Sequence, residues 1–179
     1  MTVKEWYSAG KTTTINNLEV FYRHSDSHSG NRKTLVCIHG FPTSSWDFEP
    51  IWEQLASRFD VIANDLIGLG RSAKPSQPIT VGLQATIIEA LLKKLDIKKA
   101  HIFAHDLGDT VAQELLARQA EGSSIVEWQS CVFLNGGLFP ETHRPRLVQK
   151  QLASPLGPRL TSLPSSYTYL RSHESVLDF

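Results

Sequence analysis

Cysteine and methionine are scarce in this chain of 179 residues, which holds two of the former and one of the latter. Cys37 and Cys131 each lie inside an apolar run. We therefore expect two buried, reduced thiols, rather than a disulfide framework or a set of metal ligands. The sequence gives no reason to expect a metal or another cofactor, and reduced cysteines fit a cytoplasmic location.

An excess of charge of either sign is also absent, because 18 Lys and Arg side chains balance 18 Asp and Glu side chains. A neutral chain has no overall field that would attract nucleic acid or an anionic membrane. No apolar run is long enough to span a bilayer, and the first ten residues lack the apolar stretch of a signal peptide. The length and composition predict one globular domain without a transmembrane span or a nucleic-acid partner.

Four short segments are apolar on both faces, which predicts buried strands. They are "TLVCIH" (34–39), "DVIAND" (60–65), "AHIFAH" (100–105) and "SCVFLN" (130–135). Segments with apolar residues at helical spacing separate them: a helix near 48–55 with Pro50 in its first turn, one over 80–95, and one from 108 or 109. This alternation predicts an α/β fold with a mostly parallel sheet. Asn16-Asn17, between two β-rich segments, predicts a hairpin that adds an antiparallel edge.

The chain changes character at about residue 139. Prolines recur at 140, 145, 155, 158 and 164, and no further buried strand is visible. We therefore expect residues 1–138 to form the folded core and residues 139–179 to form a separate, poorly ordered segment.

The sharpest motif is "FAHDLGDT", in which a buried strand ends at His105 and a helix follows Asp106. Ala104 and Gly108 flank Asp106 at minus two and plus two, which is the spacing of a nucleophile elbow. The small residues let the backbone turn sharply, and the strand end is where parallel sheets bind ligands. A plain alternative is that Asp106 only caps the helix.

The motif "HGFP" supplies a second part of such a site. An elbow needs two N–H donors for a developing negative charge, one after the nucleophile and one from an earlier loop. The N–H of Leu107 is the first candidate. The second is the N–H of Phe41, in the loop that His39, Gly40 and Pro42 shape.

The motifs "HGFPTSSWD", "DLIGLGRSAKP", "HDLGD" and "NGGLFPETHRP", which follow in order over about residues 12–146, resemble the α/β-hydrolase family. The resemblance is to its epoxide hydrolase and haloalkane dehalogenase branch, and within it to the mesoderm-specific transcript proteins. It implies that Asp106 is the nucleophile, that residues 39–42 form the oxyanion loop, and that residues 139–179 are part of a lid.

An aspartate nucleophile suits a particular chemistry. A carboxylate is already an anion at neutral pH and can displace at an electrophilic carbon to form an ester. Attack on an ester carbonyl would give a high-energy anhydride, so plain esterase activity is disfavoured. The expected substrate is a small electrophile, above all an epoxide. Leu107 stands where dehalogenases carry tryptophan, which makes a haloalkane substrate the weaker alternative.

The family pattern is incomplete in this chain. The resemblance places the catalytic acid and histidine late in the sequence, and one alternative acid position holds Asn135. The later histidines, His143 and His173, lie in lid-like sequence. We therefore expect a hydrolase fold truncated at its C-terminus, with impaired turnover.

Two interpretations of the whole chain stay open. It is either an aspartate-nucleophile hydrolase or a non-catalytic hydrolase-fold protein that serves as an interaction module. In both cases the strand at 130–135 would be an exposed apolar edge, which favours self-association. Relatives of the mesoderm-specific transcript type also suggest association with the endoplasmic reticulum membrane as an alternative to the cytoplasm.

Overall fold

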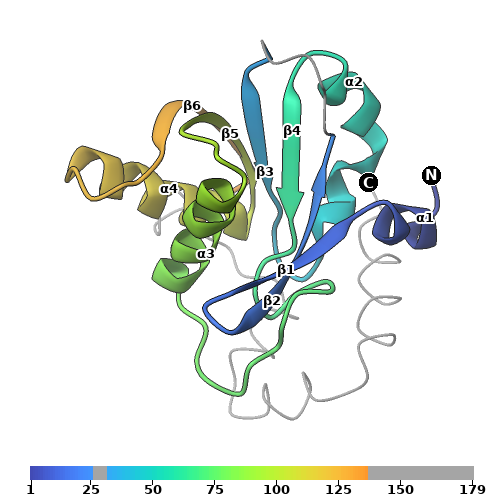
Figure 1. Ribbon diagram of the computed structural model, residues 1–179, viewed down its shortest axis with the longest axis horizontal. Helices are drawn as coiled ribbons and strands as arrows, with labels where there is room; N and C mark the ends of the chain where they lie inside the picture. Colours follow the sequence, from blue (N-terminus) through green and yellow to red (C-terminus); the bar gives the residue numbers. More distant parts are fainter. Residues whose placement is uncertain (26–31, 137–179) are drawn as a thin grey trace. The chain divides into compact units, whose positions relative to one another are not determined.

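The computed structural model describes residues 1–25 and 32–136, so the predicted lid segment, residues 139–179, lies outside the described residues. The described part contains one sheet with the strand order β1-β2-β4-β3-β5-β6 (Figure 1). The strands are β1 (Lys11–Ile15), β2 (Leu18–His24), β3 (Thr34–Ile38), β4 (Asp60–Asn64), β5 (Lys99–His105) and β6 (Glu127–Leu134).

The pairing pattern confirms the predicted mixed sheet. Strands β4, β3, β5 and β6 pair in parallel, while β2 runs antiparallel to both β1 and β4. Asn16 and Asn17 form the turn between β1 and β2, and both have positive φ angles, of 49° and 61°. Asparagine tolerates this left-handed conformation better than most residues, so these two positions fix the hairpin and its register.

Helices cover both faces of the sheet. They are α1 (Val3–Ser8), the 3-10 helix η1 (Ser45–Ile51), α2 (Trp52–Ala56), α3 (Val81–Lys94) and α4 (Leu107–Ala120). On one face α3 and α4 pack against the larger apolar core, which includes Ile102 and Leu115. On the other face α1, η1 and α2 enclose a smaller core around Trp6 and Trp52. Because β4, β3, β5 and β6 run in parallel, their carboxyl ends meet at one rim of the sheet.

Several local expectations differ from the structure. Strand β6 was expected to be buried, but it has no fully buried residue after Trp128, and Cys131 on it is only partly buried. The N-terminal residues form a short helix that was not predicted, in which Thr2 and Glu5 make reciprocal capping contacts. The segment after the loop of residues 39–42 begins as a 3-10 helix at Ser45, so Pro50 lies inside η1 rather than in the first turn of an α-helix. Strand β6 begins at Glu127, three positions before the predicted start, because its first residues pair with the start of β5 across a bulge.

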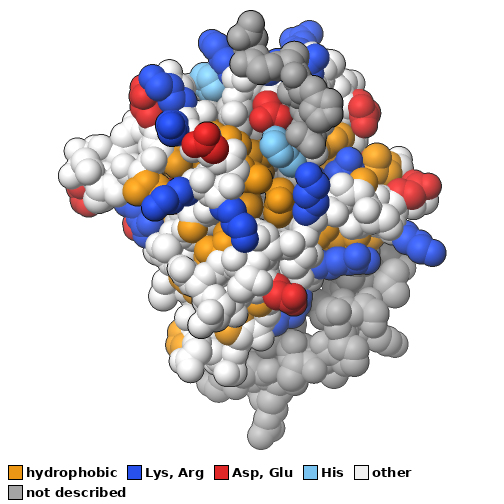
Figure 2. All heavy atoms as spheres, viewed as in Figure 1, with side chains coloured by type: hydrophobic (Ala, Val, Ile, Leu, Met, Phe, Trp, Pro, Cys, Tyr) orange, Lys and Arg blue, Asp and Glu red, His pale blue; other side chains and the backbone are white. Residues whose placement is uncertain are grey.

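The surface shows the charge balance expected from the composition. On the face drawn in Figure 2, acidic and basic side chains are interspersed with hydrophobic ones. Within residues 1–25 and 32–136, no helix combines the length and the apolar character needed to cross a bilayer.

Candidate active site

Asp106 occupies a strained turn between β5 and α4. Its φ and ψ angles are 56° and −115°, a combination that side-chain-bearing residues rarely adopt, with a cost of about 1–3 kcal/mol. Such strain persists only where the surroundings enforce it. The turn therefore has the local geometry of an elbow that presents one side chain at the carboxyl rim of the sheet.

The Asp106 carboxylate is held by the opposite loop and does not cap its own helix. Its Oδ1 accepts a hydrogen bond of 2.9 Å from the backbone N–H of Phe41, 65 positions away. It makes no capping bond to the first turn of α4. The structure therefore brings together the two motifs that the sequence singled out, and the capping interpretation does not describe this side chain.

Leu107 is the first residue of α4. The N–H groups in the first turn of a helix have no acceptor within the helix. The Leu107 N–H thus has no acceptor within α4, and the helix dipole at this end favours negative charge.

Two glycines allow the close approach of these loops. A Cβ on Gly40 would lie 2.5 Å from the Cβ of Asp106, and a Cβ on Gly108 would lie 2.2 Å from the carbonyl oxygen of Ile38. Real Cβ atoms do not come this close to other heavy atoms. Gly40 and Gly108 are therefore required by space at the site, and for Gly108 this is what the elbow motif predicts.

His39 is buried and supports the loop that follows β3. Its side chain has no solvent exposure, and its Nε2 accepts a 2.9 Å hydrogen bond from the Leu66 N–H. Its Nδ1 lies 2.7 Å from the Gly40 carbonyl oxygen, to which it donates, since Nε2 is the acceptor. Burial lowers the pKa of His39. A neutral imidazole with both nitrogens engaged positions the loop and is not free to act as a base.

The loop continues through a cis peptide bond between Phe41 and Pro42. Its far end is tied to the segment after β4 by Asp65, which is fully buried. The carboxylate of Asp65 accepts hydrogen bonds of 2.8 Å from the Ser45 N–H and 2.7 Å from the Arg71 N–H. Asp65 therefore joins the loop that contains Ser45 to the loop that contains Arg71.

Sequence reasoning missed a second carboxylate at the elbow. Asp109, in the first turn of α4, is fully buried, and its Oδ1 lies 3.3 Å from the Leu134 N–H at the end of β6. An aspartate in the first helical turn is usually exposed and paired with the helix dipole. The end of β6 and Gly136, which are distant in sequence, lie against this one.

No hydrogen bond or ion pair joins a histidine to a carboxylate near Asp106 in the part of the chain that the structure describes, although His105, the residue before Asp106, interacts electrostatically with Asp109. The pair that does occur joins His24 and Asp60, at 2.9 Å, at the opposite ends of β2 and β4 from the site. His101 is hydrogen-bonded to Ser130 at an exposed position midway along β5 and β6. His143 and His173 lie outside the described residues.

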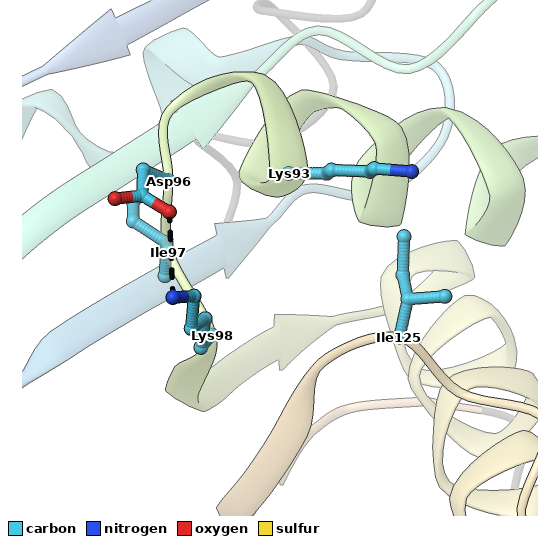
Figure 3. Close-up of a pocket in the computed structure, with 5 residues that line it drawn as sticks. All are labelled: Lys93, Asp96, Ile97, Lys98 and Ile125. Atoms are coloured by element: carbon cyan, nitrogen blue, oxygen red, sulfur yellow. Dashed lines mark ion pairs between the residues drawn. The ribbon is translucent and has the colours of Figure 1, made fainter.

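A shallow cavity of about 320 Å³ lies away from Asp106, at the N-terminal end of β5 (Figure 3). Lys93, Asp96, Ile97, Lys98 and Ile125 line it, and Asp96 forms an ion pair of 3.8 Å with Lys98. None of the chemistry-bearing residues at the elbow contributes to this cavity. The described residues also contain no group of three or more His, Cys, Asp and Glu side chains suited to a metal ion.

These features define a class of α/β protein, in which a mostly parallel sheet carries a strained strand-to-helix turn facing an N–H donor from an earlier loop. Residues 33–156 match the family model described as the alpha/beta hydrolase fold. The chain belongs to this family, as its motifs predicted.

Individual relatives agree with this assignment. The chain is 43% identical over 173 residues to the mesoderm-specific transcript homolog protein of Homo sapiens, covering 93% of this chain and 52% of that protein. It is 33% identical over 171 residues to the putative hydrolase LipZ of Mycobacterium tuberculosis, covering 94% and 58%. Among solved structures, the epoxide hydrolase CorEH superposes with a TM-score of 0.62 at 25% identity, covering 80% and 48%. The chain spans about half the length of these proteins.

Proposed function

We propose that this chain carries the nucleophilic half of an aspartate-dependent hydrolase that acts on epoxide-like electrophiles. The observation that carries the proposal is the hydrogen bond of 2.9 Å from the Phe41 N–H to Oδ1 of Asp106. It fixes one carboxylate oxygen, while no described residue is hydrogen-bonded to Oδ2. One oxygen is thus oriented and the other is available for attack.

In the first step, Oδ2 attacks a ring carbon of the epoxide and forms an ester bond to Asp106. The carbon–oxygen bond of the ring breaks, and its electron pair remains on the departing oxygen, which takes a proton from solvent or from a donor side chain. A strained three-membered ring suits this step, because the carboxylate needs no deprotonation before it reacts.

In the second step, water attacks Cγ of the ester, and the negative charge develops on Oδ1. This is the atom that the Phe41 N–H already contacts, and the Leu107 N–H lies at the start of the adjacent helix. Preorganised donors aimed at a developing oxyanion are a large source of rate enhancement. Collapse of the intermediate breaks the bond between Cγ and the substrate oxygen, which takes up the proton that the base removed from water, so the diol leaves and the carboxylate is restored.

The second step also requires a base that takes a proton from water. Among the described residues no hydrogen bond or ion pair joins a histidine to a carboxylate at the elbow, and His39 has both nitrogens engaged. We therefore expect this chain to form the ester and to hydrolyse it slowly.

Intact-mass spectrometry after incubation with styrene oxide tests the proposal. We expect a single adduct of one styrene oxide per chain, located on Asp106 by peptide mapping, and little free diol. Asp106→Asn keeps the shape of the side chain but removes the anionic nucleophile, so this variant should remain unlabelled.

Two outcomes would contradict the proposal. Equal labelling of the Asp106→Asn variant would show that the reagent modifies other groups. Diol formation over many turnovers would show that a base serves the site, and the proposed stalled ester would be wrong.

The choice of an epoxide over a haloalkane depends on Leu107. A halide leaving group needs side-chain donors, and leucine offers none. Chloride release from 1-chlorobutane without labelling by styrene oxide would reverse this preference. A chain that reacts with neither probe would favour the non-catalytic alternative.

A further inference from the structure

Asp109 is an unusual residue to find inside the elbow. It follows Asp106 by three positions, in the first turn of α4, and its side chain has no solvent exposure. Burying a carboxylate is unfavourable unless hydrogen bonds compensate for the lost water. The contacts of the Asp109 carboxylate therefore indicate which part of the site it holds in place.

The contacts of Asp109 connect it to the backbone of Asp106 through one residue of β6. Its Oδ1 lies 3.3 Å from the Leu134 N–H, and the Leu134 carbonyl oxygen accepts a 2.9 Å hydrogen bond from the Asp106 N–H. Leu134 is thus held on both sides, by the side chain of Asp109 and by the main chain of Asp106.

The other carboxylate oxygen is enclosed by the chain that leaves β6. A Cβ on Gly136 would lie 2.0 Å from Oδ2 of Asp109, and Oδ2 itself makes no hydrogen bond of good geometry. The Asp109 carboxylate therefore fills a space that only glycine leaves open, and it has no room to turn away from Leu134.

We propose that Asp109 is a positioning residue of the elbow, which holds the end of β6 and thereby keeps Asp106 in its strained, reactive conformation. This inference rests on the proposed function of Asp106. The strained turn needs surroundings that enforce it, and the link from Asp109 through Leu134 to the Asp106 N–H supplies them from the side opposite to Phe41.

The charged and titratable groups around Asp109 belong to three elements. His105 lies on β5, Asp106 lies in the turn, and Cys131 lies on β6. Burial raises the pKa of Asp109, and the backbone amides of Leu134 and Gly136 partly oppose the rise. Burial, together with the charge of Asp109, raises the pKa of the Cys131 thiol to about 11, so this thiol stays protonated at neutral pH.

Two substitutions separate the acceptor oxygen from the charge. Asp109→Ala removes the acceptor for the Leu134 N–H, whereas Asp109→Asn keeps an oxygen at that position. Glu89→Ala is the matched control. Glu89 is a buried acid on α3 that is 5% exposed and accepts hydrogen bonds from Arg118 and Ser124. Arg118 lies nine residues beyond Asp109 on α4, roughly 13 Å along the helix.

The experiment measures the rate of Asp106 labelling by styrene oxide, the hydrogen exchange of the Leu134 and Asp106 amides, and the thermal midpoint of each variant. Asp109→Ala should slow labelling by about tenfold to a hundredfold, as misplaced reacting groups do, and should speed exchange at both amides. Asp109→Asn should restore labelling to within roughly threefold of the wild type, because it restores the acceptor. Glu89→Ala should lower the thermal midpoint without slowing labelling.

Several results would overturn the inference. Labelling of Asp109→Ala at the wild-type rate would show that the elbow does not need this carboxylate. Equal loss in Asp109→Asn and Asp109→Ala would show that charge, rather than the acceptor, matters. If Asp109→Ala does not fold, Asp109→Asn and the exchange of its Leu134 amide decide the question. If the wild type is not labelled at all, the proposed function fails, and the exchange measurements alone decide whether Asp109 holds β6 to the turn.

Discussion

At the scale of single residues, the elbow holds two carboxylates three positions apart in different environments. Asp106 is half-buried at the rim and bonded to a loop amide, while Asp109 is fully enclosed behind it. Groups of the same chemical type acquire different properties when their surroundings differ in this way. The exposed member suits reaction with a substrate, and the enclosed member suits the support of the turn.

Asp109 should make the stability of the fold depend on pH. Because burial raises its pKa, there is a pH window in which the folded state keeps a proton that the unfolded state has released. Stability from this group is greatest below that window and falls as pH rises through it. Asp109→Asn does not titrate, so its free energy of unfolding relative to the wild type should increase with pH, as urea denaturation from roughly pH 4 to pH 8 would show.

Glu127→Gln provides a control of opposite sign. A hydrogen bond from Lys99 lowers the pKa of Glu127, so its contribution to stability is present at neutral pH and lost as pH falls. The stability of Glu127→Gln relative to the wild type should therefore decrease with pH. A flat difference between Asp109→Asn and the wild type would mean that Asp109 does not titrate differently in the folded and unfolded states.

At the scale of elements, local sequence signals predicted the strands and most helices. The apolar runs before His39 and Asp106 predicted β3 and β5, and the Asn16-Asn17 pair predicted the hairpin. Helix α1 was missed because it is short and buries only Trp6 and Tyr7, so no apolar period develops. The one local sequence signal for α1 was the pair of Thr2 and Glu5, which has the spacing of a capping box.

The candidate site was only partly predictable, because several of its contacts join residues that are distant in the sequence. The contact between Phe41 and Asp106 followed from two motifs whose joint geometry is set by parallel strands ending at one rim. The burial of Asp109 depends on where β6 ends, and the tautomer of His39 depends on the Leu66 amide. No local sequence pattern identifies Leu134 as the partner of Asp109 or Leu66 as the partner of His39.

The junction of β3 with α4 depends on the absence of a side chain at Gly108. A Cβ there would lie 2.2 Å from the Ile38 carbonyl oxygen, so Gly108→Ala should lower the free energy of unfolding by about 2–4 kcal/mol through overpacking against backbone. Gly82→Ala is the matched control, because the nearest atom to its Cβ, on the Arg118 side chain, would lie 3.6 Å away. In α3 this change should stabilise by about 0.4–1 kcal/mol. Urea denaturation of both variants measures the contrast, which equal effects would refute.

At the scale of the whole molecule, the sheet has two different edges. The hairpin strand β1 forms one edge, and β6 forms the other among the described strands. Strand β6 is eight residues long, carries one charged side chain, and exposes Val132 and Leu134 to 48% and 38%. Long edges with few charges are prone to pair with other chains.

We predict that the chain self-associates through the β6 edge. Sedimentation velocity should show species larger than the monomer at micromolar concentration, and Val132→Lys should reduce them because a charge on an edge strand opposes pairing. Ile125→Lys is the control, since Ile125 is 55% exposed but precedes the strand. A monodisperse monomer at all concentrations would contradict this prediction.

The double attachment of Leu134 has a consequence that joins the outermost strand to the reactive turn. Leu134 is the last residue of β6, yet its two main-chain polar groups belong to Asp106 and Asp109. We therefore expect a polypeptide that docks along this strand to act on the elbow through one residue, Leu134. If the chain both self-associates and reacts as proposed, a neighbour bound at the β6 edge should change the rate at which Asp106 is labelled.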